Sequence, residues 1–281
     1  MDARKVCNHI LLMTKIISSL QNPLIKNVLL LGEKPRARKE QNRIVIEGLR
    51  EIKLAIMSGF SITDLLFAPE LISPADLNTL TQEINQATLT EVSHDVFNRM
   101  AYRKDTGGLI ALAEPKRLTF RDLQLSNTPL LLVLESVEKP GNLGALLRTA
   151  DAANLDAVII CDPQTDIYNP NAIRSSIGCI FTMPVVTTTS EEAVSWMRAT
   201  GIKIFGTALT ANHHYHNTDF CQPAAIIMGS EANGLSSIWL EGSDDLIKIP
   251  MMGKIDSMNV SASAAIVIFE AMRQRGFGST S

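Results

Sequence analysis

Two segments of this chain place glycines and polar side chains directly behind short apolar runs. Asn142 and Arg148 follow the apolar residues 130–134, and two glycines nearby open a predicted helix. Glu231 follows the apolar residues 224–228 in a second turn that contains glycine. Amide, carboxylate and guanidinium groups in such positions can orient a polar ligand and stabilise negative charge that develops on it. Both turns are therefore candidates for a reactive site.

A third segment with similar chemistry lies near the C-terminus. After the apolar residues 246–249, Ser257 or Asn259 can cap a helix that we expect to reach about residue 275. Ser261 adds another hydroxyl, so the cap region holds more polar groups than a packed helix start requires. A capped terminal helix is the simpler interpretation, and a working site is the alternative.

The elements that must position these segments read as a parallel sheet. Apolar runs without polar alternation are separated by helical patterns, which is typical of strands covered on both faces. The expected strands are 130–134, 157–160, 202–206 and 224–228. Ligands bind beyond the carboxyl ends of such strands, where all three segments begin. Neither a GxGxxG pattern nor a P-loop is present there, which argues against a dinucleotide or ATP site.

The chain is expected to hold two domains. Residues 14–114 read as a smaller αβ unit, residues 115–129 as a polar linker, and residues 130–281 as the parallel-sheet domain. Residues 1–13 read as an extension. In the smaller unit, residues 16–31 have a helical pattern, and strands are expected at 43–48, 62–68, 88–92 and 109–113.

Charge is distributed unevenly along the chain. The net charge is −3, yet residues 1–53 contain 11 Lys and Arg against 5 Asp and Glu. The compact cluster Lys34, Arg36, Arg38 and Lys39 predicts contact with a polyanion, most commonly nucleic acid. A solvated helix face is the alternative. A second basic spot comprises Arg99, Arg103 and Lys104.

Several classes of protein are disfavoured. No apolar run reaches the roughly 18 residues that a membrane span needs. The four cysteines form no CxxC pair, so neither a disulfide framework nor a zinc site is indicated, and a cytoplasmic setting is expected. His213, His214 and His216 with Cys221 lack the helical i, i+4 spacing of metal ligands, so we expect a surface loop and no metal.

Together the three segments resemble the motifs of the SpoU/TrmH branch of the SPOUT RNA methyltransferases. The matching stretches are Asn-Leu-Gly-Ala-Leu-Leu-Arg at 142–148, Met-Gly-Ser-Glu-Ala-Asn-Gly-Leu-Ser at 228–236, and Ile-Pro-Met through Ser-Met-Asn-Val-Ser-Ala-Ser at 249–263. The resemblance covers residues 128–276. Residues 14–113 resemble that family's substrate-binding domain, an L30e-like RNA-binding fold.

The resemblance implies a sheet threaded as a deep trefoil knot and a homodimer in which the C-terminal helices pack together. It also implies S-adenosylmethionine, held largely by backbone groups of the knot loops. By position, the cofactor-binding residues are Thr207, Ala208, Leu209, Gly229, Ile249, Met258 and Ser261.

The implied reaction is methylation of a ribose 2′-hydroxyl, with ribosomal RNA favoured over transfer RNA. Arg148, Asn142, Glu231 and Asn259 match the family's catalytic positions. Arg148 orients the hydroxyl in this interpretation, and a structural salt bridge is its alternative. Two other activities stay open, namely methylation of a base and RNA binding without catalysis.

The segment 169–176 offers one further RNA contact. Arg174, with Ser175, is placed to touch a phosphate in the implied fold. A capped structural helix explains the same residues equally well.

Overall fold

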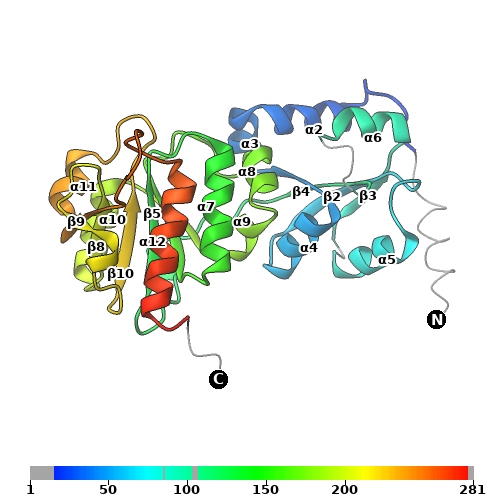
Figure 1. Ribbon diagram of the computed structural model, residues 1–281. Helices are drawn as coiled ribbons and strands as arrows, with labels where there is room; N and C mark the ends of the chain where they lie inside the picture. The colour runs from blue at the N-terminus through cyan, green and yellow to red at the C-terminus, as the bar shows by residue number, and fades with distance from the viewer. Residues whose placement is uncertain (1–15, 85, 103–106, 278–281) are drawn as a thin grey trace. The chain divides into compact units, whose positions relative to one another are not determined.

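The structure is a computed structural model, and it describes residues 16–84, 86–102 and 107–277. Contacts divide the chain into two compact units (Figure 1). One comprises the described residues up to Lys116 together with Tyr168–Phe181, and the other comprises Arg117–Ile167 and the residues from Thr182 onward. The expected extension 1–13 lies outside the described residues. None of the described helices is long and apolar enough to cross a membrane.

The first unit is built on a four-stranded sheet in the order β1-β4-β2-β3. Its strands are β1 (Ile44–Glu47), β2 (Ile62–Phe67), β3 (Thr88–Glu91) and β4 (Leu109–Ala113). β4 pairs antiparallel with β1 and β2, and β2 pairs parallel with β3. The helices are α2 (Pro23–Glu33), α3 (Pro35–Gln41), α4 (Leu49–Met57), α5 (Pro74–Glu83), α6 (His94–Met100) and α8 (Pro170–Ser175). The four expected strands are confirmed.

The start of the first helix was predicted wrongly. Residues 16–22 are not helical, and α2 begins at Pro23 because Asn22 accepts a hydrogen bond from the Leu24 N–H at 2.9 Å. Upstream of this cap, the Ile17 N–H donates to the Glu91 carbonyl at 3.0 Å. The chain therefore joins the end of β3 before it turns into α2.

The second unit contains a seven-stranded sheet in the order β7-β6-β5-β10-β8-β11-β9, and every pair is parallel. Its strands are β5 (Leu130–Glu135), β6 (Ala157–Cys161), β7 (Val185–Thr188), β8 (Lys203–Thr207), β9 (His213–His214), β10 (Ala224–Met228) and β11 (Asp245–Lys248). The interior strands β5, β6 and β10 are buried along their whole length. The predicted parallel sheet is confirmed, while β7 and β9 were not predicted.

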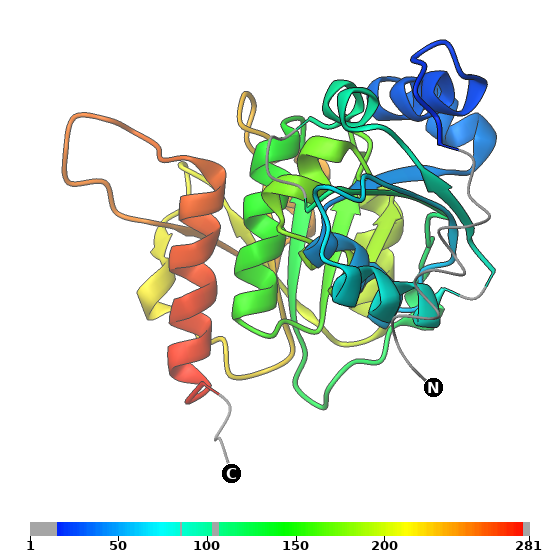
Figure 2. The same ribbon diagram turned by 90° about the vertical axis from the view of Figure 1, so that its right-hand side faces the viewer.

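Helices cover both faces of this sheet (Figures 1 and 2). Because side chains alternate along a strand, Leu131, Val133 and Ile227 share one face, where they pack with residues of α10 (Ser190–Ala199) and α11 (Ser237–Gly242). On the other face, α7 (Pro140–Ala152) lies beside α12 (Val260–Gln274). Helices on both faces explain why these strands are apolar along their whole length, as the sequence predicted.

The expected linker, residues 115–129, carries structure of its own. A 3-10 turn, η1 (Phe120–Asp122), is held by the capping box between Thr119 and Asp122. The Phe120 ring stacks on Trp196 of α10, with 4.3 Å between ring centroids. Much of this segment is therefore packed against the second unit.

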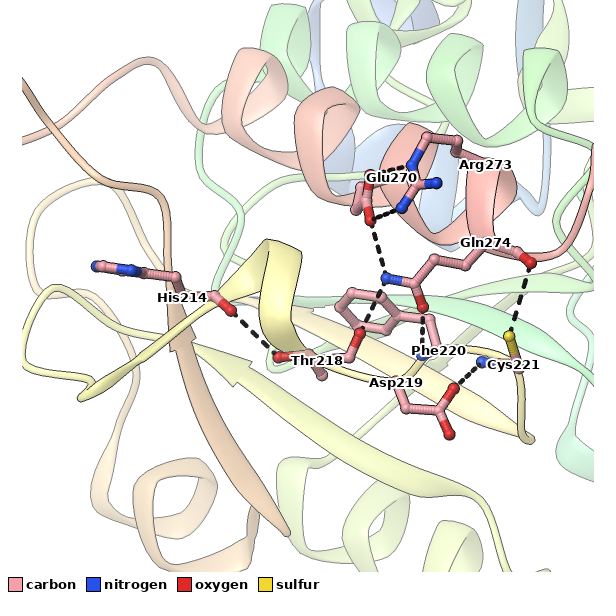
Figure 3. Close-up of polar contacts among 8 residues, drawn as sticks. All are labelled: His214, Thr218, Asp219, Phe220, Cys221, Glu270, Arg273 and Gln274. Carbon is pink, nitrogen blue, oxygen red and sulfur yellow. Dashed lines mark hydrogen bonds and ion pairs between the residues drawn. The ribbon is translucent and has the colours of Figure 1, made fainter.

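The C-terminal end of α12 is fixed by Gln274 (Figure 3). Its side-chain amide donates to the Thr218 carbonyl and accepts from the Phe220 N–H, each at 2.9 Å. It also donates to Glu270, whose pKa falls to about 2 because Arg273 forms two hydrogen bonds with the carboxylate. These contacts tie the last turn of α12 to the segment that precedes β10.

Arg275, directly after α12, donates to four backbone carbonyls. They belong to Thr128 at 2.6 Å, Gln222 at 2.7 Å, Phe220 at 2.8 Å and Pro129 at 3.3 Å. Two precede β5 and two precede β10, so one guanidinium group joins the starts of two neighbouring strands to the end of α12.

Replacement of Arg275 by methionine is expected to lower the free energy of unfolding by about 2 kcal/mol, because it leaves these carbonyls without their charged donor. The matched variant Arg273→Met removes a pair with Glu270 in which the arginine side chain is exposed, and its expected cost is below about 1 kcal/mol. Urea unfolding followed by circular dichroism measures both. Equal losses in the two variants would contradict this role for Arg275.

Candidate active site

The carboxyl ends of four strands meet at one edge of the larger sheet. β10 lies between β5 and β8, and β11 lies beyond β8. Met228 is level with Leu134, and Ile247 is level with Thr207. The segments that follow these strands therefore begin side by side, as the sequence predicted for the three polar segments.

Side-chain hydrogen bonds join those three segments directly. The Asn142 amide, in the first turn of α7, donates to the Glu231 carboxylate after β10. The Asn259 amide, at the start of α12, donates to the Asn142 side-chain carbonyl at 3.3 Å. Three of the four predicted catalytic residues are thus in contact, although up to 117 residues separate them in sequence.

Lys139 completes this polar chain, and sequence reasoning missed it. Its ammonium group pairs with the second carboxylate oxygen of Glu231. The hydrogen bond from Lys139 holds the pKa of Glu231 below its usual value, and the bond to Glu231 raises the pKa of Lys139 in turn. Glu231 is therefore a carboxylate at neutral pH. The only sequence signal was a lysine placed just before Pro140, the first residue of α7.

Asn259 also caps α12, as one of the two predicted alternatives. Its side-chain oxygen accepts from the Ser261 N–H at 2.9 Å and from the Ser261 hydroxyl at 2.5 Å. One side chain thus caps a helix with its oxygen and reaches Asn142 with its nitrogen. The capping geometry fixes the orientation of the amide, because swapping its two ends would break these contacts.

The turn after β10 is tightly closed. Ser230 and Gly234 exchange two backbone hydrogen bonds of 3.0 Å. A Cβ atom on Gly229 would lie 2.3 Å from the carbonyl carbon of Gly234, so no other residue fits there without movement of the backbone. On the far side of the turn, the Ser236 N–H donates to the buried Glu135 carboxylate at 2.9 Å. The turn is therefore rigid where it presents Glu231.

A small pocket opens beside this turn, between the ends of β5 and β10 and the start of α12. Its walls combine apolar side chains with three carboxylates. The lining residues are Leu134, Glu135, Val137, Glu138, Leu146, Met228, Gly229, Ser230, Glu231 and Val260. Its volume of about 10 Å³ has room for about one water molecule.

Arg148 does not join the polar chain. It lies two turns into α7, its side chain is exposed, and it forms no ion pair within the part of the chain that the structure describes. The structural salt bridge considered from the sequence is therefore absent there. The guanidinium group remains available to a ligand.

The predicted cofactor-binding residues lie along the same edge. The Thr207 hydroxyl donates to the Ile227 carbonyl at 2.7 Å, and the Ala208 N–H donates to the Ile247 carbonyl at 3.0 Å. Leu209 is exposed, Ile249 directly follows β11, and Met258 precedes the cap of α12. With Gly229 and Ser261 they surround the ends of β8, β10 and β11.

The basic cluster of the first unit is only partly available. Lys34, Arg36 and Lys39 are exposed on or beside α3, where Arg36 also pairs with Glu40 at 2.6 Å. The prediction that Arg38 contacts RNA was wrong. This residue is buried, and it donates to the Leu31 and Gly32 carbonyls at 2.5 and 3.2 Å near the end of α2, so it serves the fold and cannot reach a phosphate.

Two further predicted segments are now located. Asn169 caps α8 by accepting from the Asn171 N–H at 2.8 Å, and the Ser175 hydroxyl donates to the Asn171 carbonyl at 2.6 Å. The expected histidine loop is instead the short edge strand β9 followed by the 3-10 turn η2 (Tyr215–Asn217). His213 contacts the Asp245 carboxylate at 2.8 Å.

Comparison with known proteins decides the family. A family model described as the SpoU rRNA Methylase family matches residues 129–269, about half of the chain. A 23S rRNA (guanosine(2553)-2'-O)-methyltransferase, RlmP, of Bacillus subtilis (strain 168) is 31% identical over 91% of this chain and 98% of its own. This chain belongs to the SpoU rRNA methylase family.

A second family model matches the first unit of this SpoU family member. An MRM3-like substrate binding domain model matches residues 22–111. A 23S rRNA (guanosine-2'-O-)-methyltransferase, RlmB, of Photobacterium profundum is 41% identical over 60% of this chain and 71% of its own.

Solved structures agree with the fold of this SpoU family member. A crystal structure described as an RNA 2'-O ribose methyltransferase has 36% identity and a TM-score of 0.80, covering 93% of this chain and 99% of its own. An AdoMet-bound rRNA methyltransferase from Sinorhizobium meliloti has 27% identity and a TM-score of 0.85, covering 92% of this chain and 98% of its own.

Replacement of Lys139 by methionine in this SpoU family member is expected to raise the pKa of the Glu231 carboxyl, because the lysine is the main cause of its lowered value. In the wild type, the ion pair stabilises the fold above the unfolded pKa of Glu231 and is lost as pH falls through the lower folded pKa. The variant therefore loses its carboxylate at higher pH during acidification. NMR titration of the Glu231 carboxyl carbon measures this shift.

The control for this titration is Lys254→Met, which removes an exposed lysine from the segment before α12. It should leave the Glu231 titration unchanged. A Glu231 pKa that stays constant or falls in Lys139→Met would show that the ion pair does not form in solution.

Proposed function

We propose that this chain transfers a methyl group from S-adenosylmethionine to a ribose 2′-hydroxyl of ribosomal RNA. The observation that carries the proposal is the contact of Asn142, Glu231 and Asn259 at the carboxyl edge of the parallel sheet. These residues come from three segments, and each segment follows a different strand of that sheet. An enzyme that must hold a cofactor and a nucleotide together requires such convergence.

The cofactor is proposed to bind at the ends of β8, β10 and β11, beside the turn that carries Glu231. S-adenosylmethionine supplies a methyl group on a positively charged sulfonium, and the ionised Glu231 carboxylate lies beside this edge. The residues that would hold the cofactor are Thr207, Ala208, Leu209, Gly229, Ile249, Met258 and Ser261.

Arg148 is proposed to act on the nucleotide. A ribose 2′-hydroxyl is a weak nucleophile that needs orientation and the removal of its proton. A guanidinium group stays protonated, so we assign Arg148 to orient the hydroxyl or its neighbouring phosphate and to stabilise the developing alkoxide. Glu231 stays ionised and holds the Asn142 amide, while Asn259 links that amide to the start of α12.

Ribosomal RNA is the substrate we favour because the relatives named above act on 23S rRNA. The first unit matches a substrate-binding domain, and Lys34, Arg36 and Lys39 expose positive charge on it. Arg174 is proposed as a further RNA contact. A cytoplasmic setting is proposed together with this activity.

We further propose that the larger sheet is knotted and that the protein is a homodimer. In support of the knot, β10 is inserted between β5 and β8, and the chain then passes β8 to form β11 before α12 returns beside α7. In support of the dimer, α12 buries Ala264 and Ile268 within the unit but leaves Phe269 41% exposed on its other side.

Replacement of Arg148 by alanine is expected to lower the rate of methyl transfer by about 100-fold or more, because one charge-stabilising group is lost from the transition state. The readout is transfer of a labelled methyl group from S-adenosylmethionine to ribosomal RNA, followed by nucleoside analysis. The expected product is a 2′-O-methyl nucleoside.

The control variant is Arg121→Ala, which removes an exposed arginine from η1 of the same unit and should retain full activity. Full activity in Arg148→Ala would refute the role of that residue. A methylated base, exclusive modification of transfer RNA, or RNA binding without transfer would each replace the proposed reaction with one of the alternatives.

Replacement of Phe269 by lysine is expected to convert the dimer to a monomer, because a charge would be buried in the apolar contact between α12 helices. Light scattering after size-exclusion chromatography measures the mass. Lys203→Ala, an exposed change at the start of β8, is the control and should leave a dimer. A dimer of unchanged stability in Phe269→Lys would place the contact on another face.

A further inference from the structure

An exposed tyrosine, Tyr102, and a half-buried arginine, Arg174, form a pair in the first unit. The guanidinium carbon of Arg174 lies 4.6 Å from the centroid of the Tyr102 ring, a cation–π contact. The two residues come from segments that are distant in sequence. Tyr102 follows α6, and Arg174 lies in the last turn of α8.

Both partners are held in place by the fold. α8 packs on β1, and its residues Ala172 and Ile173 are buried, which fixes the helix that carries Arg174. The Tyr102 N–H donates to the Glu47 carboxylate of β1 at 3.1 Å. Strand β1 therefore positions both residues, Arg174 through the packing of α8 and Tyr102 through the hydrogen bond to Glu47.

These contacts leave part of each side chain available to a ligand. Tyr102 is 66% exposed, which is unusual for a large aromatic side chain that one cation already covers on one face. Arg174 forms no ion pair with any residue that the structure describes, and Arg99 in the last turn of α6 adds exposed positive charge. The Glu47 carboxylate is the nearby negative group, and the Tyr102 N–H engages it.

We propose that Tyr102 and Arg174 form a stacking platform for an unpaired nucleobase of the substrate RNA. RNA-binding proteins read single-stranded regions by stacking bases on aromatic rings or arginine planes. Here the arginine covers one side of the ring, and the open side is left for a base. The proposal rests on the proposed function and adds to it the structural class of RNA, a loop or other unpaired region.

The stacking role differs from simple attraction of phosphate. A phosphate site needs the charge of Arg174 but not the ring of Tyr102, and it would bind duplex and abasic strands as well as an unpaired strand. A stacking platform needs the ring, requires a base, and tolerates any base because each has an aromatic face. The two roles can therefore be separated by variants and by probes.

The experiment measures the affinity of the full chain for three probes by fluorescence anisotropy. They are a short unstructured RNA oligonucleotide, the same strand annealed to its complement, and an abasic strand of equal length. Tyr102→Leu keeps side-chain bulk without an aromatic face, and its Kd for the unpaired strand should rise about 10-fold. Its affinity for the duplex and abasic strands should stay within about two-fold of wild type.

Matched variants sharpen the result. Tyr102→Phe keeps the ring and should bind like wild type, and so should Met57→Ala, which trims an exposed side chain elsewhere in the unit. Arg174→Gln should weaken binding of the unpaired strand and lower the salt dependence of that binding. Tyr102→Leu should leave that salt dependence unchanged.

Wild-type affinity of Tyr102→Leu for the unpaired strand, or an equal loss on all three probes, would overturn the platform. If Tyr102→Leu lowers the melting temperature and the resulting loss of folded protein fully accounts for its weaker binding, the platform is also overturned. The pair would then serve packing. The proposed function is tested separately, because wild-type methyl transfer that persists in these variants with an unchanged KM for RNA refutes only the platform.

Discussion

The polar chain from Lys139 through Glu231 and Asn142 to Asn259 is the constraint on which the site depends. Each hydrogen bond joins two segments that follow different strands. The strands must therefore end at the same level for these four side chains to meet. A parallel sheet with β10 between β5 and β8 provides that level edge. Because Glu231 uses both carboxylate oxygens, removal of either partner leaves a charged acceptor without part of its compensation.

The helix α12 transmits this constraint through the second unit. Asn259 anchors its first turn to the site, whereas Gln274 and Arg275 anchor its last turn to the segments before β5 and β10. The helix therefore spans the sheet from the carboxyl edge to the opposite edge and is fixed at both. Its exposed side, which includes Phe269, is held in a defined position for a second subunit in the proposed dimer.

The sequence predicted what depends on local pattern. Continuous apolar runs identified β5, β6, β8 and β10, and glycines with polar residues behind them marked the loops that carry Asn142 and Glu231. It did not predict what depends on tertiary partners. Lys139 gave no signal of its own, and Arg38 was grouped with the predicted RNA-binding cluster. Only the fold shows Lys139 against a carboxylate and Arg38 buried against carbonyls. Residues 16–22 continue a helical pattern, yet their backbone finds a strand partner first.

The arginines show why composition alone cannot assign these roles. A helix leaves its last carbonyls without internal partners, and Arg38 donates to such groups near the end of α2. Arg275 does the same at the starts of two strands. Arg148 lies inside α7, where the carbonyls within its reach are already used by the helix. Its charge is not used by its own backbone, which is why we propose that Arg148 engages the nucleotide.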